Sequence, residues 1–342
     1  MEFRKLSGAG LTLPALTFGT ATFGGGNEFF KAWGSTDVAE AKELIDICLD
    51  HGVNHFDTAN VYSQGMSEEI LGAAIKGKRD KLLISTKATF PMGPDVNDVG
   101  SSRQSLMKAC EDSLKRLGTD HIDIFFMHGF DATTPVEETL SALNDLVRSG
   151  KIRYIGCSNF SGWQLMKSMS VSEKHGWSKY ALHQTYYSLV NRELEWELMP
   201  ASIDQKVSNI IWSPLAGGAL SGKITRQNPP APGTRSAAMD FVVSAKSDHL
   251  FNIVDVLHAV AKEVNKSVAQ VAYNWLLQKP TVASLIIGAR NKEQLLQNFG
   301  AVGWTLPKEM MAKLDAVSET KPIYPYWHQN QFPMLGHPMI KA

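Results

Sequence analysis

Short apolar runs alternate with segments of helical periodicity along most of the chain. Runs rich in Val, Ile, Leu and Phe predict buried strands, and apolar residues that recur at helical spacing predict helices between them. The expected strands lie at 15–20, 53–57, 82–86, 122–127, 152–159, 180–184, 209–214 and 282–287. The expected helices lie at 37–52, from 67, at 106–117, at 135–150, from 161, near 194, and at 251–264, 268–277, 291–299 and 308–318.

Eight such strand-then-helix units predict an α/β fold whose parallel sheet closes into a (β/α)8 TIM barrel. An open doubly wound sheet is the alternative. However, the residues after the first strand, F-G-T-A-T-F-G-G-G, lack the G-x-G-x-x-G spacing of a dinucleotide-binding turn. Weak alternation around Gly8 and Gly10 predicts an N-terminal β-hairpin over residues 1–14. We expect one domain over 1–342, with a C-terminal helix followed by a tail at 320–342.

The charge balance narrows the class of partner. Lys plus Arg and Asp plus Glu number 34 each, so the formal net charge is zero, which argues against binding of nucleic acid or an anionic membrane surface. The first residues lack the apolar segment of a signal peptide, and no stretch of 18 apolar residues occurs. The cysteines Cys48, Cys110 and Cys157 are far apart and suit neither a disulfide framework nor a metal pair. We expect a cytoplasmic protein with buried thiols and no metal.

Four groups with proton-transfer chemistry follow the ends of three successive strands. Asp57 and Tyr62 lie in V-N-H-F-D-T-A-N-V-Y, Lys87 ends L-L-I-S-T-K, and His128 ends I-D-I-F-F-M-H. Residues at the C-terminal ends of barrel strands face the active-site mouth. Each residue alone would more often be a helix cap, a packed aromatic or a solvated charge. Together, on consecutive strands, they predict one site.

These residue types suit the protonation of an alkoxide. A Lys ammonium favours the phenolate form of a nearby Tyr, whose reference pKa is about 10, and an Asp paired with the Lys keeps it charged and oriented. A His at the same mouth can donate a hydrogen bond to the carbonyl oxygen of a substrate. None of these groups carries a hydride, so the site requires a cofactor.

Eight motifs, spread over nearly the whole chain, carry a resemblance to one enzyme family. They are G-V-N-H-F-D-T-A-N-V-Y, L-G-A-A-I-K, I-S-T-K, L-x-R-L-G-T-D-H-I-D-I-F-F-M-H, G-K-I-R-Y-I-G-C-S-N-F, Q-T-Y-Y-S-L, W-S-P-L-A-G-G-A-L-S-G-K and I-I-G-A-R-N-x-x-Q-L-x-x-N. With them the sequence resembles the aldo-keto reductase superfamily, and within it the bacterial branch that is similar to potassium-channel β subunits. The resemblance implies a (β/α)8 barrel, NADPH bound in an extended form across the strand ends, and a catalytic tetrad. That tetrad falls on Asp57, Tyr62, Lys87 and His128, with Tyr62 as the proton donor.

The resemblance also implies a cofactor site along the later strand ends. Ser158, Asn159 and Gln184 offer hydrogen-bonding groups to a carboxamide. Trp212 offers a flat face to a nicotinamide ring. Arg290 precedes the helix at 291–299, where backbone N–H groups and a guanidinium suit a 2′-phosphate. The expected set that binds NADPH or NADP⁺ is Thr20, Asp57, Ser158, Asn159, Gln184, Trp212, Ser213, Leu215, Gly217, Gly222, Lys223, Arg235, Gly288, Arg290, Gln294, Gln297 and Asn298.

The expected function is that of an NADP-dependent aldo-keto reductase (EC 1.1.1.-), a cytoplasmic oxidoreductase that reduces a small aldehyde or ketone. Two alternatives stay open: a redox-sensing regulatory subunit that binds the cofactor and turns over slowly, and a barrel isomerase or lyase that binds a phosphate near Arg290. A homo-oligomer stays open as well. Two segments depart from the family pattern. The glycine-rich loop at 24–34 is longer than the first strand needs, so the sequence does not define the substrate mouth, and the aromatic stretch I-Y-P-Y-W-H-Q-N-Q-F-P of the tail has no family role.

Overall fold

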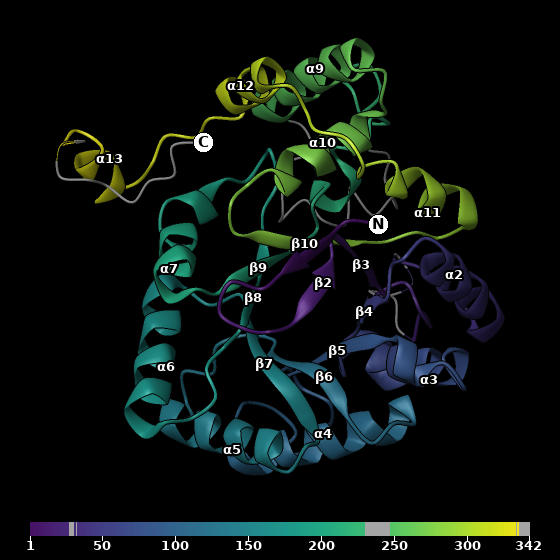
Figure 1. Ribbon diagram of the computed structural model, residues 1–342, viewed down its shortest axis with the longest axis vertical. Coiled ribbons are helices and arrows are strands. Elements are labelled where there is room, and N and C mark those ends of the chain that lie inside the picture. The colour runs from purple at the N-terminus through teal and green to yellow at the C-terminus, as the bar shows by residue number, and fades with distance from the viewer. Residues whose placement is uncertain (27–30, 32, 230–246, 333, 335–342) are drawn as a thin grey trace.

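The computed structural model describes residues 1–26, 31, 33–229, 247–332 and 334. Its centre is a closed barrel of parallel strands in the order β10-β3-β4-β5-β6-β7-β8-β9 (Figure 1). The strands are β3 (Leu16–Gly19), β4 (His55–Asp57), β5 (Leu83–Ala88), β6 (Ile122–Met127), β7 (Ile152–Ser158), β8 (Leu182–Tyr186), β9 (Ser208–Trp212) and β10 (Val282–Ile287). The (β/α)8 barrel predicted from the alternation is therefore confirmed, and the open doubly wound sheet is excluded.

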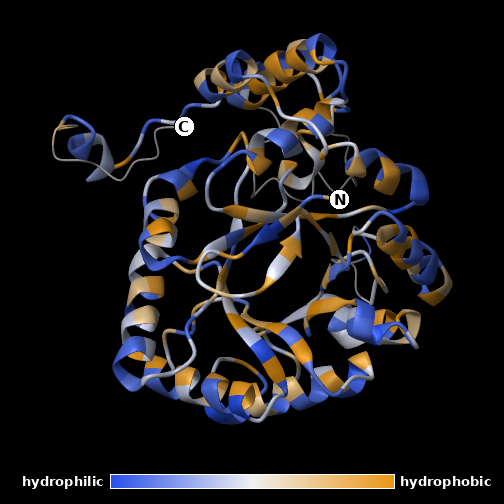
Figure 2. Ribbon diagram, viewed as in Figure 1, coloured by the Kyte–Doolittle hydropathy of each residue, from blue (hydrophilic) through white to orange (hydrophobic). Residues whose placement is uncertain are grey.

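Helices follow the strands and surround the barrel (Figure 1). They are α2 (Val38–Asp50), α3 (Met66–Ala74), α4 (Arg103–Leu117), α5 (Val136–Arg148), α6 (Gly162–His175), α7 (Leu198–Gln205), α9 (Asp248–Glu263), α10 (Val268–Leu277), α11 (Lys292–Phe299), α12 (Lys308–Val317) and α13 (Tyr326–Gln329). Short 3-10 turns are η1 (Tyr62–Gly65), η2 (Arg79–Lys81), η3 (Glu193–Glu195) and η4 (Ala216–Gly218). Hydrophobic and hydrophilic bands alternate along the helices around the barrel (Figure 2), because one side of such a helix packs on the strands or on a neighbouring helix and the other faces solvent.

The predicted N-terminal hairpin is present. Strands β1 (Phe3–Lys5) and β2 (Thr12–Pro14) pair antiparallel. Leu6, which follows β1, and Leu13, which lies in β2, are buried in a cluster that includes Leu182 and Ala283. Because Leu182 and Ala283 stand at the beginnings of β8 and β10, the hairpin closes that end of the barrel. The opposite end, where the strands finish, is left for a site.

The helix starts show which local signals determine the structure. Asp37 caps α2 as expected, since its Oδ1 accepts from Glu40 N at 2.9 Å and Glu40 Oε2 accepts from Asp37 N at 3.1 Å. The residues S-E-E at 67–69 have the pattern of a capping box, which predicts Ser67 as the capping residue of α3, and this prediction is wrong. Ser67 lies inside the helix, and its hydroxyl donates to Thr20 O at 2.8 Å. The residue at the cap position is Gly65 in the left-handed conformation, because α3 is entered from a turn rather than from an extended segment.

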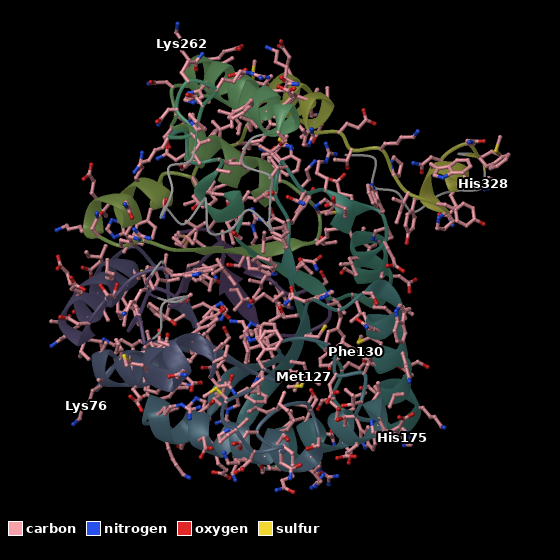
Figure 3. The ribbon with its side chains drawn as sticks, turned by 180° about the vertical axis from the view of Figure 1, so that it is seen from behind. Lys76, Met127, Phe130, His175, Lys262 and His328 are labelled. Atoms are coloured by element: carbon pink, nitrogen blue, oxygen red, sulfur yellow. The ribbon has the colours of Figure 1, made fainter. Side chains whose placement is uncertain are left out.

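The described part of the tail leaves the barrel after α12, and α13 stands apart from the strands and surrounding helices (Figures 1 and 3). The ring of Tyr326 in α13 stacks on that of Trp196 in the body of the molecule at 6.2 Å between centroids. The side chains of Ile323 and Tyr324 are mostly exposed. Among the described residues, no helix has the length and apolar character needed to cross a membrane.

Candidate active site

Three neighbouring strands bring the four predicted proton-transfer groups together. Asp57 is the last residue of β4, Lys87 lies next to the end of β5, and His128 follows β6 directly. Met127 and Phe130, which flank His128, lie near the middle of the molecule when it is seen from behind (Figure 3). Because β4, β5 and β6 are adjacent and parallel, their carboxyl ends meet at one mouth.

An ion pair lies at the bottom of this mouth. Lys87 Nζ is 2.5 Å from Asp57 Oδ2 and donates to Thr58 O at 2.7 Å, and Tyr62 Oη is 3.4 Å away. The Lys87 side chain is fully buried and that of Asp57 nearly so. Burial alone would lower the pKa of Lys87, but the Asp57 carboxylate and the Tyr62 phenol raise it, and the result is a pKa above its usual value of 10.5. An ammonium therefore faces the Tyr62 oxygen at neutral pH.

His128 completes the set as a neutral imidazole. Burial, and then the nearby charge of Lys87, hold the pKa of His128 well below 6.5. Its ring lies 4.4 Å from that of Phe90 and meets the Tyr62 ring edge-on at 5.9 Å between centroids. Asn159 Nδ2 donates to His128 O at 3.0 Å and so fixes its backbone. A neutral imidazole keeps one N–H donor, which suits a carbonyl oxygen placed beside Tyr62.

Tyr62 is presented by a strained turn. The two residues that follow it, Ser63 and Gln64, have positive φ angles of 49° and 57°, which non-glycine residues rarely adopt. The Ser63 hydroxyl stabilises the turn, since it donates to Phe23 O at 2.9 Å and accepts from Gly25 N at 3.0 Å. A Cβ on Gly24 would lie 2.9 Å from Met66 Sδ, so the first glycines of the predicted loop at 24–34 allow this close packing.

A cavity of about 620 Å³ opens over these groups at the strand ends. It is large enough to hold most of an extended dinucleotide or a substrate with part of one. The expected residues that line it are Asp57, Tyr62, His128, Ser158, Asn159, Gln184, Trp212, Ser213, Leu215, Gly217, Lys223, Gly288, Gln294, Gln297 and Asn298. Lys87 lies beneath its floor. Thr20, Gly222 and Arg290 do not line it, and Arg235 lies outside the described residues.

The wall made by β7, β8 and β9 has the chemistry of a nicotinamide site. Trp212 stacks one face on Tyr186, at 4.7 Å between centroids, and its Nε1 donates to Asn159 Oδ1 at 3.0 Å. The side-chain amide of Asn159 is thus engaged at both ends by protein groups. Ser158 Oγ is buried in the cavity wall and has no hydrogen-bond partner among the described residues, so it can serve a carboxamide. Gln184 Nε2 donates to Asp57 Oδ1 at 3.0 Å, which leaves its carbonyl oxygen to accept.

The loop after β9 brings polar side chains close to the cavity. Ser213, Ala216 and Gly217 have positive φ angles of 51°, 49° and 66°, and Ser213 Oγ accepts from Gly217 N at 3.0 Å. Gly222 has a φ of 85°, and a Cβ there would lie 2.9 Å from Val268 Cβ. Most backbone N–H groups of this loop already donate within it, among them those of Ala216, Gly217 and Gly218. The side chains of Ser213, Ser221 and Lys223, which line the cavity, are what the loop offers to the oxygens of a pyrophosphate.

One side of α11 forms the far end of the cavity. Gln294, Gln297 and Asn298 line it, and Asn298 Nδ2 donates to Gly288 O at 3.2 Å. Arg290 is exposed beside this end, where its Nε donates to Trp33 O at 3.2 Å and its backbone N donates to Gln294 Oε1 at 3.0 Å. The guanidinium therefore stands at the rim rather than inside the cavity.

Two groups of functional candidates were not anticipated from the sequence. Trp33, Val61 and Phe90 line the cavity. Phe90 follows β5 closely, so a strand-end rule could have indicated it, whereas no local pattern marks Trp33. His55 and Ser85, two residues before Asp57 and Lys87, are fully buried below the mouth. The period of two along a strand puts each pair on the same face and could have indicated them.

Comparison with known proteins agrees with this geometry. The sequence pattern of the Aldo/keto reductase family matches residues 15–319. The chain is 37% identical over 329 residues to the uncharacterized oxidoreductase YrpG of Bacillus subtilis (strain 168), covering 93% of this chain and 96% of that protein. It is 35% identical over 332 residues to a probable voltage-gated potassium channel subunit beta of Oryza sativa subsp. japonica (94% and 98%). It is 32% identical over 332 residues to the L-glyceraldehyde 3-phosphate reductase of Escherichia coli O157:H7 (92% and 92%).

Proposed function

Since the chain belongs to the aldo/keto reductase family, we propose that it is an NADPH-dependent reductase of aldehydes or ketones in which Tyr62 is the proton donor. The observation that supports this most strongly is the Asp57–Lys87 ion pair with the Tyr62 oxygen 3.4 Å from the ammonium. An ammonium at that distance stabilises the phenolate that remains once the proton has left. The direction of reduction to the alcohol and the choice of NADPH are parts of the proposal.

The chain's own residues would position the carbonyl and move one proton. His128, neutral because its pKa is lowered, donates a hydrogen bond to the substrate oxygen and orients it beside Tyr62 Oη. The Tyr62 O–H gives its proton to that oxygen as negative charge develops there. Lys87 faces the resulting phenolate, and Asp57 balances the Lys87 charge when no phenolate is present.

Bound NADPH would supply the hydride that the protein itself lacks. Ser158 Oγ and the Gln184 carbonyl oxygen would hold the carboxamide, and the free face of Trp212 would stack on the ring. The side chains of Ser213, Ser221 and Lys223, which line the cavity beside this loop, would contact the pyrophosphate. Gln294 and Asn298 would hold the adenosine end, with Arg290 at the rim for the 2′-phosphate.

The substrate side of the cavity has apolar walls. Val61 adjoins Tyr62 in the chain, and Phe90 packs on the His128 ring. We propose that aldehydes with an aromatic or aliphatic substituent bind between these residues. A substrate with a flat apolar group would contact the Phe90 ring while its carbonyl reaches Tyr62 and His128.

A second candidate function is a cofactor-binding redox sensor with slow turnover, which the resemblance to a plant channel subunit beta favours. Both candidates use the same cavity, so binding cannot separate them. Steady-state consumption of NADPH with a panel of aromatic and aliphatic aldehydes does: sustained turnover supports the reductase, and a single slow turnover supports the sensor.

A fluorescence titration tests the cofactor separately. NADPH should quench the emission of Trp212 if the ring stacks there, and a Trp212→Phe variant should lose that part of the quenching. If NADPH leaves the fluorescence unchanged up to millimolar concentration, the proposed cofactor site is wrong.

A further inference from the structure

A row of buried polar side chains runs across the barrel interior below the Asp57–Lys87 pair. Ser284 Oγ lies 2.7 Å from Thr17 Oγ1, which lies 2.8 Å from His55 Nδ1. On the other side of the ring, His55 Nε2 lies 3.1 Å from Ser85 Oγ. Ser85 Oγ lies 2.6 Å from Asp57 Oδ1. All of these side chains are fully or almost fully buried.

The donor and acceptor of each hydrogen bond in this row can be assigned by starting from Asp57, at its end. Asp57 is paired with the Lys87 ammonium, so its carboxylate can only accept, and Ser85 must donate its one hydroxyl proton to Asp57 Oδ1. The Ser85 oxygen then has only lone pairs to offer, so the contact with His55 Nε2 requires an N–H on that nitrogen.

The rest of the row follows from the charge of His55. The pKa of His55 is lowered to about 4, because burial, helped by the charge of Lys87, outweighs the charges of Asp57 and Asp123, which raise it. The ring is therefore neutral at pH 7, and with a proton on Nε2 it keeps a lone pair on Nδ1. Thr17 must donate to Nδ1, and Ser284 must donate to the Thr17 oxygen.

We propose that four side chains form a one-way chain of hydrogen-bond donors that ends on Asp57: Ser284, Thr17, His55 and Ser85. In this chain His55 is held as the neutral Nε2–H tautomer, and it is a positioning residue for the ion pair of the active site. The part that His55 plays in catalysis rests on the proposed reductase function. Every donor in the chain points toward the carboxylate, and donors aligned in this way strengthen one another. With Gln184 as a second donor, the chain fixes the Oδ1 side of Asp57 and turns Oδ2 toward Lys87.

The tautomer is tested without turnover. Protein labelled with ¹⁵N-histidine gives a long-range ¹H–¹⁵N correlation spectrum, in which the His55 signals are identified by their loss in His55→Gln. We expect a neutral ring protonated at Nε2 between about pH 5.5 and 8. A ring protonated at Nδ1, or a charged ring in this range, overturns the proposal, whether or not the protein proves to be a reductase.

The same spectrum of two further variants tests the direction of the chain. Ser85→Ala removes the lone pairs that require a proton on Nε2 and leaves Thr17 in place, so the Nδ1–H form of His55 should become populated. Thr17→Val removes only the donor to Nδ1, and the Nε2–H form should persist, because Ser85 still offers only lone pairs to Nε2. An unchanged tautomer in Ser85→Ala, or a shift to Nδ1–H in Thr17→Val, would overturn the one-way chain.

Kinetics test the effect on the site. Ser85→Ala and His55→Leu should each lower kcat by about tenfold, the worth of one hydrogen bond to a charged group, with KM for NADPH changed by less than about twofold. His55→Gln should restore most of the loss, since its amide N–H₂ can stand near the position of Nε2 and donate to Ser85. The matched control is Ser168→Ala, which removes a buried hydroxyl on the outer helix α6 and should leave kcat unchanged.

The outcomes separate the two proposals. Wild-type kcat in Ser85→Ala, or His55→Gln as slow as a folded His55→Leu, removes the positioning role. If the wild-type protein does not turn over any carbonyl compound with NADPH, the proposed function fails, and the spectra still decide whether the donor chain exists.

Discussion

At the scale of single residues, the site depends on groups that hold one another in a chosen protonation state. Lys87 stays charged because Asp57 and Tyr62 raise its pKa, and His128 stays neutral because burial lowers its pKa. The pKa of Lys87 is thus raised and that of His128 lowered, although both side chains belong to the same site. A site that must both stabilise a phenolate and donate to a carbonyl oxygen needs such a division. Two predictions follow from single atoms of this set.

Replacement of Tyr62 by Phe should remove the proposed proton donor and leave cofactor binding nearly intact. General acid catalysis is worth about 10²–10⁴-fold, so kcat should fall at least that far while the Kd for NADPH changes little. Tyr180→Phe, at a buried tyrosine outside the cavity, is the matched control. More than about a tenth of wild-type kcat in Tyr62→Phe, with chemistry shown to limit the rate, would contradict the role of Tyr62.

Replacement of Lys87 by Met should move the pH dependence of residual activity to higher pH. The ammonium persists through neutral pH because the pKa of Lys87 is raised, and it favours loss of the Tyr62 proton. Without it, Tyr62 keeps its proton to higher pH, so the alkaline limb of the kcat profile shifts upward. Lys78→Met, at an outer lysine paired with Asp46, should not shift the limb. If the alkaline limb of the kcat profile is unchanged in Lys87→Met, Lys87 has only a structural role.

At the scale of elements, strands were easier to predict than the turns that join them. Buried strands carry their signal in a run of apolar residues, and all eight expected runs are strands. Ser67 had the sequence of a capping residue, yet it bonds to Thr20 inside the barrel, because the turn before α3 is left-handed at Ser63 and Gln64. Neither residue is a glycine, so the local sequence does not predict a left-handed turn. The turn is stabilised by the hydrogen bonds that the Ser63 hydroxyl makes to residues distant in the chain.

The candidate site shows the same contrast. The four proton-transfer residues follow strand ends, so the fold alone brings them together. The exposed position of Arg290, outside the cavity, depends on how the loop that contains Trp33 lies against α11. Contacts between segments so far apart in the chain leave no periodic signal in the sequence.

Arg290 gives a prediction at the scale of α11. Arg290→Ala should weaken NADPH and leave NADH almost unchanged, because only NADPH has a 2′-phosphate for the guanidinium. A charge-assisted contact of about 1.5–3 kcal/mol corresponds to a factor on the order of ten to a hundred in Kd. Lys292→Ala, at the first residue of the same helix, is the control. Equal small changes for both cofactors, measured at one salt concentration, would show that Arg290 is a solvated charge that only ties the loop of Trp33.

At the scale of the whole molecule, the barrel interior is polar where it supports the site, and this links stability to pH. The pKa of His55 is lowered to about 4 and that of His183 to about 3, both by burial. The unfolded chain, whose histidines titrate near about 6.5, binds more protons than the folded chain as pH falls below that value. The free energy of unfolding must therefore decrease from about pH 6.5 toward pH 4.

Urea unfolding at a series of pH values checks this. The His55 contribution is on the order of 3 kcal/mol across its window, since each pKa unit corresponds to about 1.4 kcal/mol. In His183→Phe, where the ring nitrogen no longer accepts from Phe160 N, stability should depend less steeply on pH. A free energy of unfolding that stays flat from pH 7 to pH 5 in the wild type would contradict the burial of neutral histidines.

The order of strands in the ring has a consequence for protein synthesis. Asp57, Tyr62, Lys87 and His128 all come from the first four barrel strands, whereas the proposed cofactor wall comes from β7 to β10. A nascent chain that has emerged as far as β6 thus carries every proton-transfer group. It lacks the strands β7 to β10 that form the proposed cofactor wall, and β3 is not yet paired with β10. The half that carries the proposed proton-transfer groups is therefore synthesised first, and the barrel can close only after β10 has been made.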